Sequence, residues 1–210
     1  MTDPCAGVCV VVAKAGANQL LNQVGFFVGA TATGFADDGV TWNGLTINRD
    51  ASGIVRCSTS GSFTIIDNVV DDYSSCSGAA VIPNTVTSIG YEAFRSATAL
   101  TSVTIPDSVT SIGFGAFAAT SALTSVNIPA SVTSIGSEAF FLATSLGSIT
   151  FNPDSQLTAI DTFLFGSATA LTSITIPASV TSIGDSAFQN ATSLTSITFQ
   201  GDQPTVGTDA

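Results

Sequence analysis

From residue 82 onward, apolar side chains recur along the chain with a nearly fixed period. Each repeat starts at an isoleucine or a phenylalanine, and successive starts are separated by 23, 23, 23, 25 and 23 residues. The six starting residues are Ile82, Ile105, Ile128, Phe151, Ile176 and Phe199. One repeat has too few apolar side chains to enclose a core, whereas stacked repeats bury each set of side chains against the next. The period therefore predicts a solenoid.

Within each repeat, the local sequence predicts one strand and one tight turn. Residues 100–105 read LTSVTI, and the β-branched residues in this segment favour a strand. Equivalent strands of successive repeats should then lie parallel in one sheet, each ended by the proline that follows in most repeats. On the opposite side of the repeat, residues 137–140 (SEAF) and their equivalents are expected to form a single helical or 3₁₀ turn with the phenylalanine pointing inward.

A glycine follows the segment VTSI in four repeats, at Gly90, Gly113, Gly136 and Gly184. We expect either a positive φ or a close approach of two backbones at these glycines. Asp161 replaces the glycine in the fourth repeat, and aspartate tolerates a positive φ better than most residues. The fourth repeat also has two extra residues near 153–156 and an apolar run at 163–165, which predict a surface bulge and a locally thicker core.

The pattern IPxSVTSIGxxAFxxxxxLTSVT resembles the BspA-like subclass of leucine-rich repeats over about residues 64–205. That family often has a cysteine after AFxx, where this chain has small residues: Ala97, Thr120, Ala143, Ala168 and Ala191. The resemblance implies a β-rich solenoid, a right-handed leucine-rich-repeat stack with a parallel sheet on one face and short helical or 3₁₀ turns on the other. An N-terminal β-rich cap is expected in addition. It also implies a surface-exposed or secreted protein that engages host, matrix or cell-surface molecules, without enzymatic activity.

The sequence divides into three regions. Residues 1–55 do not match the repeat and are expected to form an N-terminal cap or a small β-rich attachment region. Residues 56–81 are a capping half-turn that leads into the array, and residues 82–210 hold five repeats of 23–25 residues and an incomplete sixth. A cap has a clear purpose, because the first repeat would otherwise expose an apolar end.

The first region carries weaker local signals. Residues 13–24 have helical character, and residues 25–30, 40–47 and 54–58 read as short strands between polar turns. If the region is instead an independent adhesion domain, its core would come from four aromatic residues: Phe26, Phe27, Phe35 and Trp42.

All four cysteines lie in the first 76 residues, at Cys5, Cys9, Cys57 and Cys76. An even number suits disulfides in an oxidising compartment, and Cys57 with Cys76 is the preferred pair, although reduced buried thiols are an alternative. The spacings do not fit a zinc site and the chain has no histidine, so no metal or other cofactor is expected.

Charge and composition narrow the function. The net charge is −11, and the four basic residues (Lys14, Arg49, Arg56 and Arg95) are scattered, which argues against nucleic-acid binding. No apolar run reaches the roughly 20 residues that cross a bilayer, and no convincing signal peptide is seen. Without histidine the commonest general base is missing. The carboxylate pairs Asp37–Asp38 and Asp71–Asp72 are interpreted as solvated turns, and Asn190 begins the only good glycosylation sequon.

Alternation along the predicted strands places a row of short polar side chains outward. The row consists of Ser102, Thr104, Ser125, Asn127, Ser148, Thr150, Ser173, Thr175, Ser196 and Thr198. Such a hydroxyl ladder could bind a protein or a glycan, or it could be an ordinary solvent-facing strand surface copied by duplication. Similar Ser/Thr rows also resemble ice-binding faces.

These features favour a secreted or cell-surface binding or adhesion module that recognises a protein or glycan partner. One alternative is a subunit of an extracellular filament or matrix, formed by end-to-end stacking; a minor one is an ice-binding protein. The polar segment after Phe199 opens another repeat, so it belongs to a longer array, folds over the last turn or takes part in such stacking.

Overall fold

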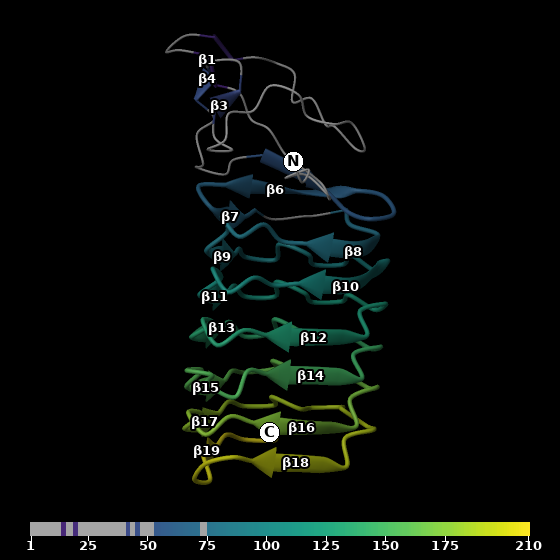
Figure 1. Ribbon diagram of the computed structural model, residues 1–210. Helices are drawn as coiled ribbons and strands as arrows, with labels where there is room; N and C mark the ends of the chain where they lie inside the picture. The colour runs from purple at the N-terminus through teal and green to yellow at the C-terminus, as the bar shows by residue number, and fades with distance from the viewer. Residues whose placement is uncertain (1–13, 16–18, 21–40, 43–44, 47–52, 72–74) are drawn as a thin grey trace.

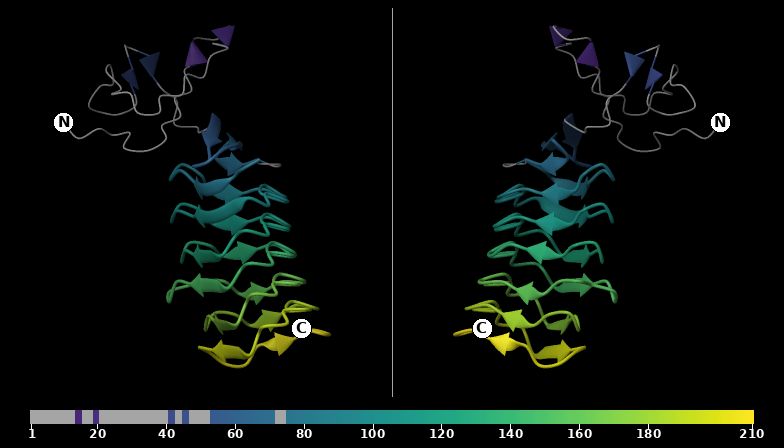
Figure 2. Two further views of the ribbon diagram at one scale, coloured as in Figure 1. Left: turned by 90° about the vertical axis from the view of Figure 1, so that its right-hand side faces the viewer. Right: turned by 90° about the vertical axis from the view of Figure 1, so that its left-hand side faces the viewer.

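The computed structural model describes residues 14–15, 19–20, 41–42, 45–46, 53–71 and 75–210. From residue 78 onward the chain winds into a column of stacked turns, and each turn contributes two short strands (Figure 1 and Figure 2). We number the turns by the sequence repeats: the first turn is 82–104, the second 105–127, the third 128–150, the fourth 151–175 and the fifth 176–198. Two ladders of strands therefore run along the column.

The first ladder is formed by the VTSIG segments, which the sequence did not predict as strands. Its members are β9 (Ser88–Ile89), β11 (Ser111–Ile112), β13 (Ser134–Ile135), β15 (Ala159–Ile160), β17 (Ser182–Ile183) and β19 (Thr205–Val206). Neighbours pair in parallel, but β13 and β15 belong to different sheets. The ladder is thus interrupted where the fourth turn carries its two extra residues.

The second ladder contains the predicted parallel strands. They are β8 (Gly78–Val81), β10 (Leu100–Thr104), β12 (Ser125–Ile128), β14 (Ser148–Phe151), β16 (Ser173–Ile176) and β18 (Ser196–Phe199). They pair in parallel as β8 with β10, β12 with β14 and β16 with β18. The expectation of a parallel sheet on one face is confirmed, as a series of two-stranded pairs.

The expectation of short helical or 3₁₀ turns on the other face is wrong, because no helix is present in the described residues. Two residues per turn adopt a positive φ, for example Glu138 (60°) and Leu142 (58°). A left-handed residue cannot propagate a right-handed helix. Alternate backbone amides also donate to the next turn, as from Phe140 N to Leu164 O at 3.0 Å, so the loops bond along the column.

The glycines after VTSI are explained by close backbone approach. In the described part of the chain, the glycines with a positive φ are Gly61, Gly78 and Gly115. A Cβ added at Gly136 would lie 2.6 Å from the backbone nitrogen of Phe114 in the preceding turn. The expectation that aspartate stands at 161 because it tolerates a positive φ is therefore wrong, since Asp161, like Gly136, lacks a positive φ. Its Cβ is tolerated where the β13–β15 ladder is interrupted.

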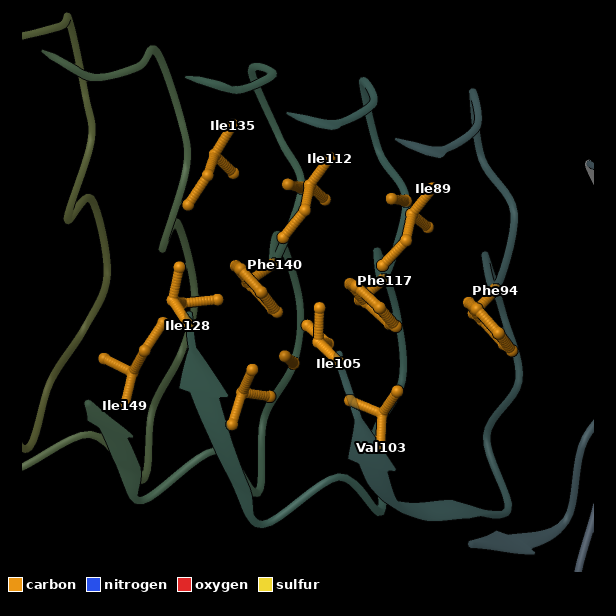
Figure 3. Packing of buried hydrophobic residues seen from close by; sticks show 14 of the residues in the cluster. Ile89, Phe94, Val103, Ile105, Ile112, Phe117, Ile128, Ile135, Phe140 and Ile149 are labelled. Atoms are coloured by element: carbon orange, nitrogen blue, oxygen red, sulfur yellow. The ribbon is translucent and has the colours of Figure 1, made fainter. Parts of the chain in front are cut away.

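Parallel stacking of phenylalanine rings forms the centre of the core (Figure 3). The rings of Phe94, Phe117, Phe140, Phe165 and Phe188 follow one another at centroid distances of 5.2–5.8 Å, with interplanar angles of 5–19°. Isoleucine, valine and leucine side chains from both ladders surround them. The small residues predicted to replace a cysteine ladder are buried in four turns, at Ala97, Thr120, Ala143 and Ala168.

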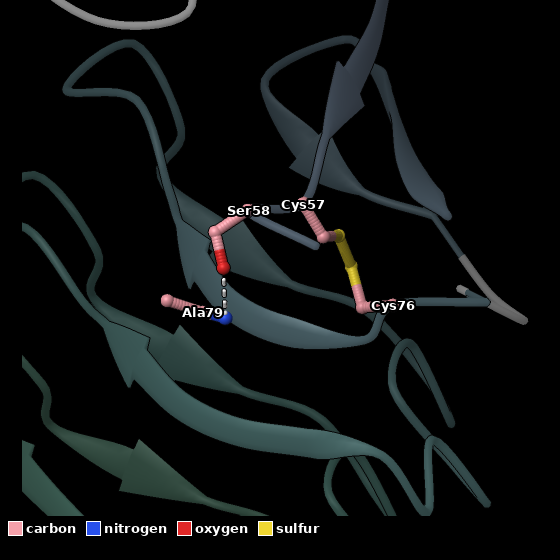
Figure 4. Close-up of a disulfide and its surroundings, with 4 residues drawn as sticks. All are labelled: Cys57, Ser58, Cys76 and Ala79. Carbon is pink, nitrogen blue, oxygen red and sulfur yellow. Dashed lines mark hydrogen bonds between the residues drawn. A yellow bond between two sulfur atoms is a disulfide. The ribbon is translucent and has the colours of Figure 1, made fainter. Parts of the chain in front are cut away.

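An antiparallel meander continues the first ladder at the N-terminal end of the column. It consists of β5 (Gly53–Arg56), β6 (Ser62–Ile66) and β7 (Val69–Val70), and β7 pairs in parallel with β9. The predicted pair Cys57–Cys76 forms a disulfide with a Cα–Cα distance of 5.4 Å (Figure 4). Beside it, the backbone amide of Ala79 donates to Ser58 Oγ at 2.6 Å. These bonds tie the meander to β8.

Removing this disulfide should destabilise the protein without changing its fold. The bridge closes a loop of 19 residues in sequence separation, and its sulfur atoms belong to buried residues. We expect the double variant Cys57→Ala/Cys76→Ala to lose about 3 kcal/mol of unfolding free energy. Urea titration measures the loss, and dithiothreitol should move the wild type toward the variant. Equal midpoints for the two oxidised proteins would contradict a stabilising role.

The remaining expectations for the N-terminal region are only partly within the described residues. The helical expectation for residues 13–24 is wrong where it can be compared, because β1 (Lys14–Ala15) and β2 (Gln19–Leu20) pair antiparallel. The expectation of strand within residues 40–47 is confirmed, since β3 (Thr41–Trp42) and β4 (Leu45–Thr46) pair antiparallel, and β5 overlaps the strand expected at 54–58. The candidates that lie outside the described residues are Cys5, Cys9, Phe26, Phe27, Phe35, Asp37, Asp38 and Asp72, together with the strand expected at 25–30.

The segment after β18 continues the column. Strand β19 pairs in parallel with β17, and Gly207 occupies the place of Gly184 one turn earlier. The polar residues between β18 and β19 are mostly exposed.

Candidate functional site

The second ladder brings the ten predicted outward residues together on one surface. In the β12–β14 pair, the Cα register places Ser125 opposite Ser148 and Asn127 opposite Thr150. In the β16–β18 pair, it places Ser173 opposite Ser196 and Thr175 opposite Thr198. All ten predicted residues are exposed, while the residues between them, such as Val126 and Ile149, are buried in every turn but the fifth, where Ile197 is exposed. We call this surface the Ser/Thr face: Ser102, Thr104, Ser125, Asn127, Ser148, Thr150, Ser173, Thr175, Ser196 and Thr198.

The Ser/Thr face contains no charged side chain, and most of its hydroxyls point to solvent without a protein partner. Within the described residues, the side-chain hydrogen bond inside this face runs from Thr150 Oγ1 to Asn127 Oδ1, at 3.0 Å. Rows of neighbouring strands lie about 4.8 Å apart. The face can therefore offer a regular array of donors and acceptors to a ligand, with little side-chain entropy to lose on binding.

The sequence did not predict two further columns of threonine. One widens the Ser/Thr face by an exposed residue at the start of the strand segment in four turns, at Thr101, Thr124, Thr172 and Thr195, whereas the third turn has Gly147 there. The other, the threonine column, lies along the first ladder and consists of Thr87, Thr110, Thr133, Thr158, Thr181 and Thr205, all exposed. The recurring Thr of VTSIG is visible in the sequence, but the segment is too short to predict a strand by itself.

Hydroxyls of the threonine column bond mainly to the protein itself. Thr110, Thr133 and Thr181 each donate to the backbone carbonyl of the threonine one turn earlier, at 3.2–3.3 Å. These bonds fix the side chains and use the hydroxyl protons. The threonine column therefore has less donor capacity for a ligand than the Ser/Thr face.

Other candidate chemistry is sparse in the described residues. They contain no group of three His, Cys, Asp or Glu side chains that could hold a metal ion. The described residues also contain no helix with the length and apolar character of a membrane span. Asn190 is exposed in the loop of the fifth turn and has a positive φ of 58°, so its sequon is accessible.

Stacked turns with two parallel ladders and a buried phenylalanine column define a leucine-rich-repeat solenoid. The model of the BspA-type leucine-rich repeat region matches residues 64–195 in six copies, which is more than half of the 210 residues. The chain therefore belongs to the BspA-type leucine-rich-repeat family. This is a family of repeat scaffolds, and the match indicates no catalytic family.

Solved bacterial structures share the fold. A leucine-rich repeat protein from Eubacterium ventriosum aligns with a TM-score of 0.60 and 24% identity, over 69% of this chain and 39% of its own. The T. pallidum leucine-rich repeat protein aligns with a TM-score of 0.59 and 21% identity, over 74% of this chain and 83% of its own. The pneumococcal vaccine antigen PcpA aligns with a TM-score of 0.51 and 17% identity, over 70% of this chain and 49% of its own.

The alignment thus spans well under two thirds of the Eubacterium ventriosum and pneumococcal chains, but most of the T. pallidum chain. No curated protein sequence matches the chain.

Proposed function

We propose that this protein is a non-enzymatic binding or adhesion module that acts in the extracellular space or at a cell surface and recognises a protein or glycan through the Ser/Thr face. The observation that carries the proposal is the in-register, exposed and uncharged array of hydroxyl and amide groups on the second ladder. Family membership supports it, as does the disulfide, which suits an oxidising compartment. The vaccine-antigen relative is consistent with display at a surface.

Charge substitutions on the Ser/Thr face test the proposal. We expect a variant with lysine at Ser148, Thr150, Ser173 and Thr175 to lose at least about tenfold in affinity for its ligand, because long charged side chains obstruct a flat polar face. The measurement is binding of the soluble protein to an immobilised panel of extracellular-matrix proteins and glycans, with thermal melting to verify folding.

A matched control places the same added charge elsewhere. It carries lysine at four members of the threonine column, Thr110, Thr133, Thr158 and Thr181, which lie on the other ladder. This control should bind like the wild type. Equal binding by the Ser/Thr-face variant and the wild type would remove the face as the binding surface. A thermal-hysteresis measurement on the wild type tests the ice-binding alternative.

A further inference from the structure

The loop of the first turn contains an ion pair. There the guanidinium of Arg95 bonds the carboxylate of Glu92, three residues earlier. The arrangement depends on the local backbone: Glu92 has a positive φ of 50°, and the amide of Arg95 donates to the carbonyl of Glu92 at 2.9 Å.

In the third turn the same backbone has a glutamate and a phenylalanine at these two places. Glu138 has a φ of 60°, and the amide of Phe141 donates to the carbonyl of Glu138 at 2.9 Å, so these residues occupy the places of Glu92 and Arg95. Within the described residues the Glu138 side chain forms neither an ion pair nor a hydrogen bond. The third turn therefore has the acidic residue of the Glu92–Arg95 pair but lacks the basic residue.

The ring of Phe141 is held in position by the fourth turn. It lies against Gly166, where an added Cβ would come within 2.9 Å of Phe141 Cδ2. The ring of Phe163 meets it edge to face at a centroid distance of 6.0 Å, and Leu142 beside it is 41% exposed. In the fifth turn the equivalent places hold polar residues: Ser186, Gln189 and Asn190. The third and fourth turns thus form a local apolar patch, which we call the Phe141 patch: Phe141, Leu142 and Phe163.

We propose that the Phe141 patch and Glu138 bind an arginine or lysine side chain presented by a partner protein. In the first turn the side chains at these two places meet in an ion pair, so a carboxylate and an aromatic ring there can both contact one cation. A guanidinium can stack on the ring while it bonds the carboxylate. A purely apolar partner is disfavoured, because it would take the Glu138 carboxylate out of water without a compensating charge.

Charge complementarity supports a basic partner. Residues 82–210 carry eight acidic side chains and one basic side chain, Arg95, which gives 1 − 8 = −7. This field attracts cationic segments to the column as a whole, and the Phe141 patch supplies the local contact. The surface is separate from the Ser/Thr face, so the two proposals stand or fall independently.

The test is an NMR titration of the full chain with the peptide acetyl-Arg-Gly-Arg-Gly-Arg-amide. We expect saturable shifts for amides in residues 138–142 and 162–166, and no shifts with the neutral citrulline analogue of the peptide. Glu138→Gln and Phe141→Gln should each weaken binding about tenfold. Phe141→Gln installs the residue that the fifth turn has at this place, so the fold should accept it.

Two further variants make the outcome decisive. Asp107→Asn removes the same charge as Glu138→Gln from an exposed corner outside the patch, and it should change the affinity less than about twofold. Phe141→Arg recreates the Glu92–Arg95 pair within the third turn, so it should abolish peptide binding while the protein stays folded. Absence of shifts, shifts outside these residues, or equal weakening by Asp107→Asn and Glu138→Gln would overturn the proposal.

Discussion

Replacement of Phe140 by alanine is expected to lower the unfolding free energy by about 3–5 kcal/mol, which is the usual cost of removing a fully buried aromatic side chain. Phe140 is inaccessible to solvent and stacks on two rings, Phe117 at 5.4 Å and Phe165 at 5.8 Å. Alanine leaves a cavity between turns that are connected by backbone hydrogen bonds, so the column cannot collapse to fill it. Urea denaturation followed by circular dichroism measures the loss.

Because a solenoid is stabilised by contacts between neighbouring turns, this cavity should also weaken coupling along the column. The Phe140→Ala transition is expected to broaden, with the turns on either side unfolding at different urea concentrations. Two control variants are expected to lose less unfolding free energy. Phe188→Ala should cost less than Phe140→Ala, because among the described residues Phe188 stacks on one ring only. Leu142→Ala should cost under about 1 kcal/mol, because Leu142 is 41% exposed. A cost for Phe140→Ala no greater than that for Leu142→Ala would contradict the central role of the stack.

Substitution of Gly136 by valine is the second change with a large expected effect. Its Cβ would lie 2.6 Å from Phe114 N and 2.9 Å from Gly113 C, both in the backbone of the preceding turn. That backbone cannot move away without breaking the β11–β13 pairing. We expect a loss of about 3 kcal/mol or more, at the upper end of what overpacking costs.

The chain offers a matched control for this substitution. A Cβ added at Gly147 would have its nearest contact at 3.7 Å, with Ala170 O, which is ordinary van der Waals separation. Gly147→Val should therefore change the unfolding free energy by less than about 1 kcal/mol. Thermal and urea unfolding of the two variants gives the comparison, and similar losses at both positions would show that backbone approach is not the reason for glycine at 136.

The Ser/Thr face was predicted residue by residue because it follows from the two-residue alternation of strands. Every predicted member is exposed, and the residues between them are buried in most turns. The threonine column was missed, since the TSI segment of each repeat is too short to show alternation and forms a strand only through pairing with its neighbours. The Phe141 patch was missed for a different reason: it combines residues of two turns that are 22 positions apart in sequence, Phe141 and Phe163.

By itself, the sequence determined the solenoid, its period, the inward phenylalanine of each repeat and the outward Ser/Thr rows. These properties depend on the apolar and polar pattern, which repeats with little variation and has one efficient way to bury its apolar side chains.

The tertiary structure alone decided how the loops are built. Each loop has two residues with a positive φ, four positions apart, and its alternate amides bond to adjacent turns, as Ala119 N does to Phe141 O at 2.7 Å, so no local helix forms. Stacking also decided which glycines are obligatory and why Asp161 is tolerated. The physical reason is that each turn finds its hydrogen-bond partners and steric limits in the turn beside it.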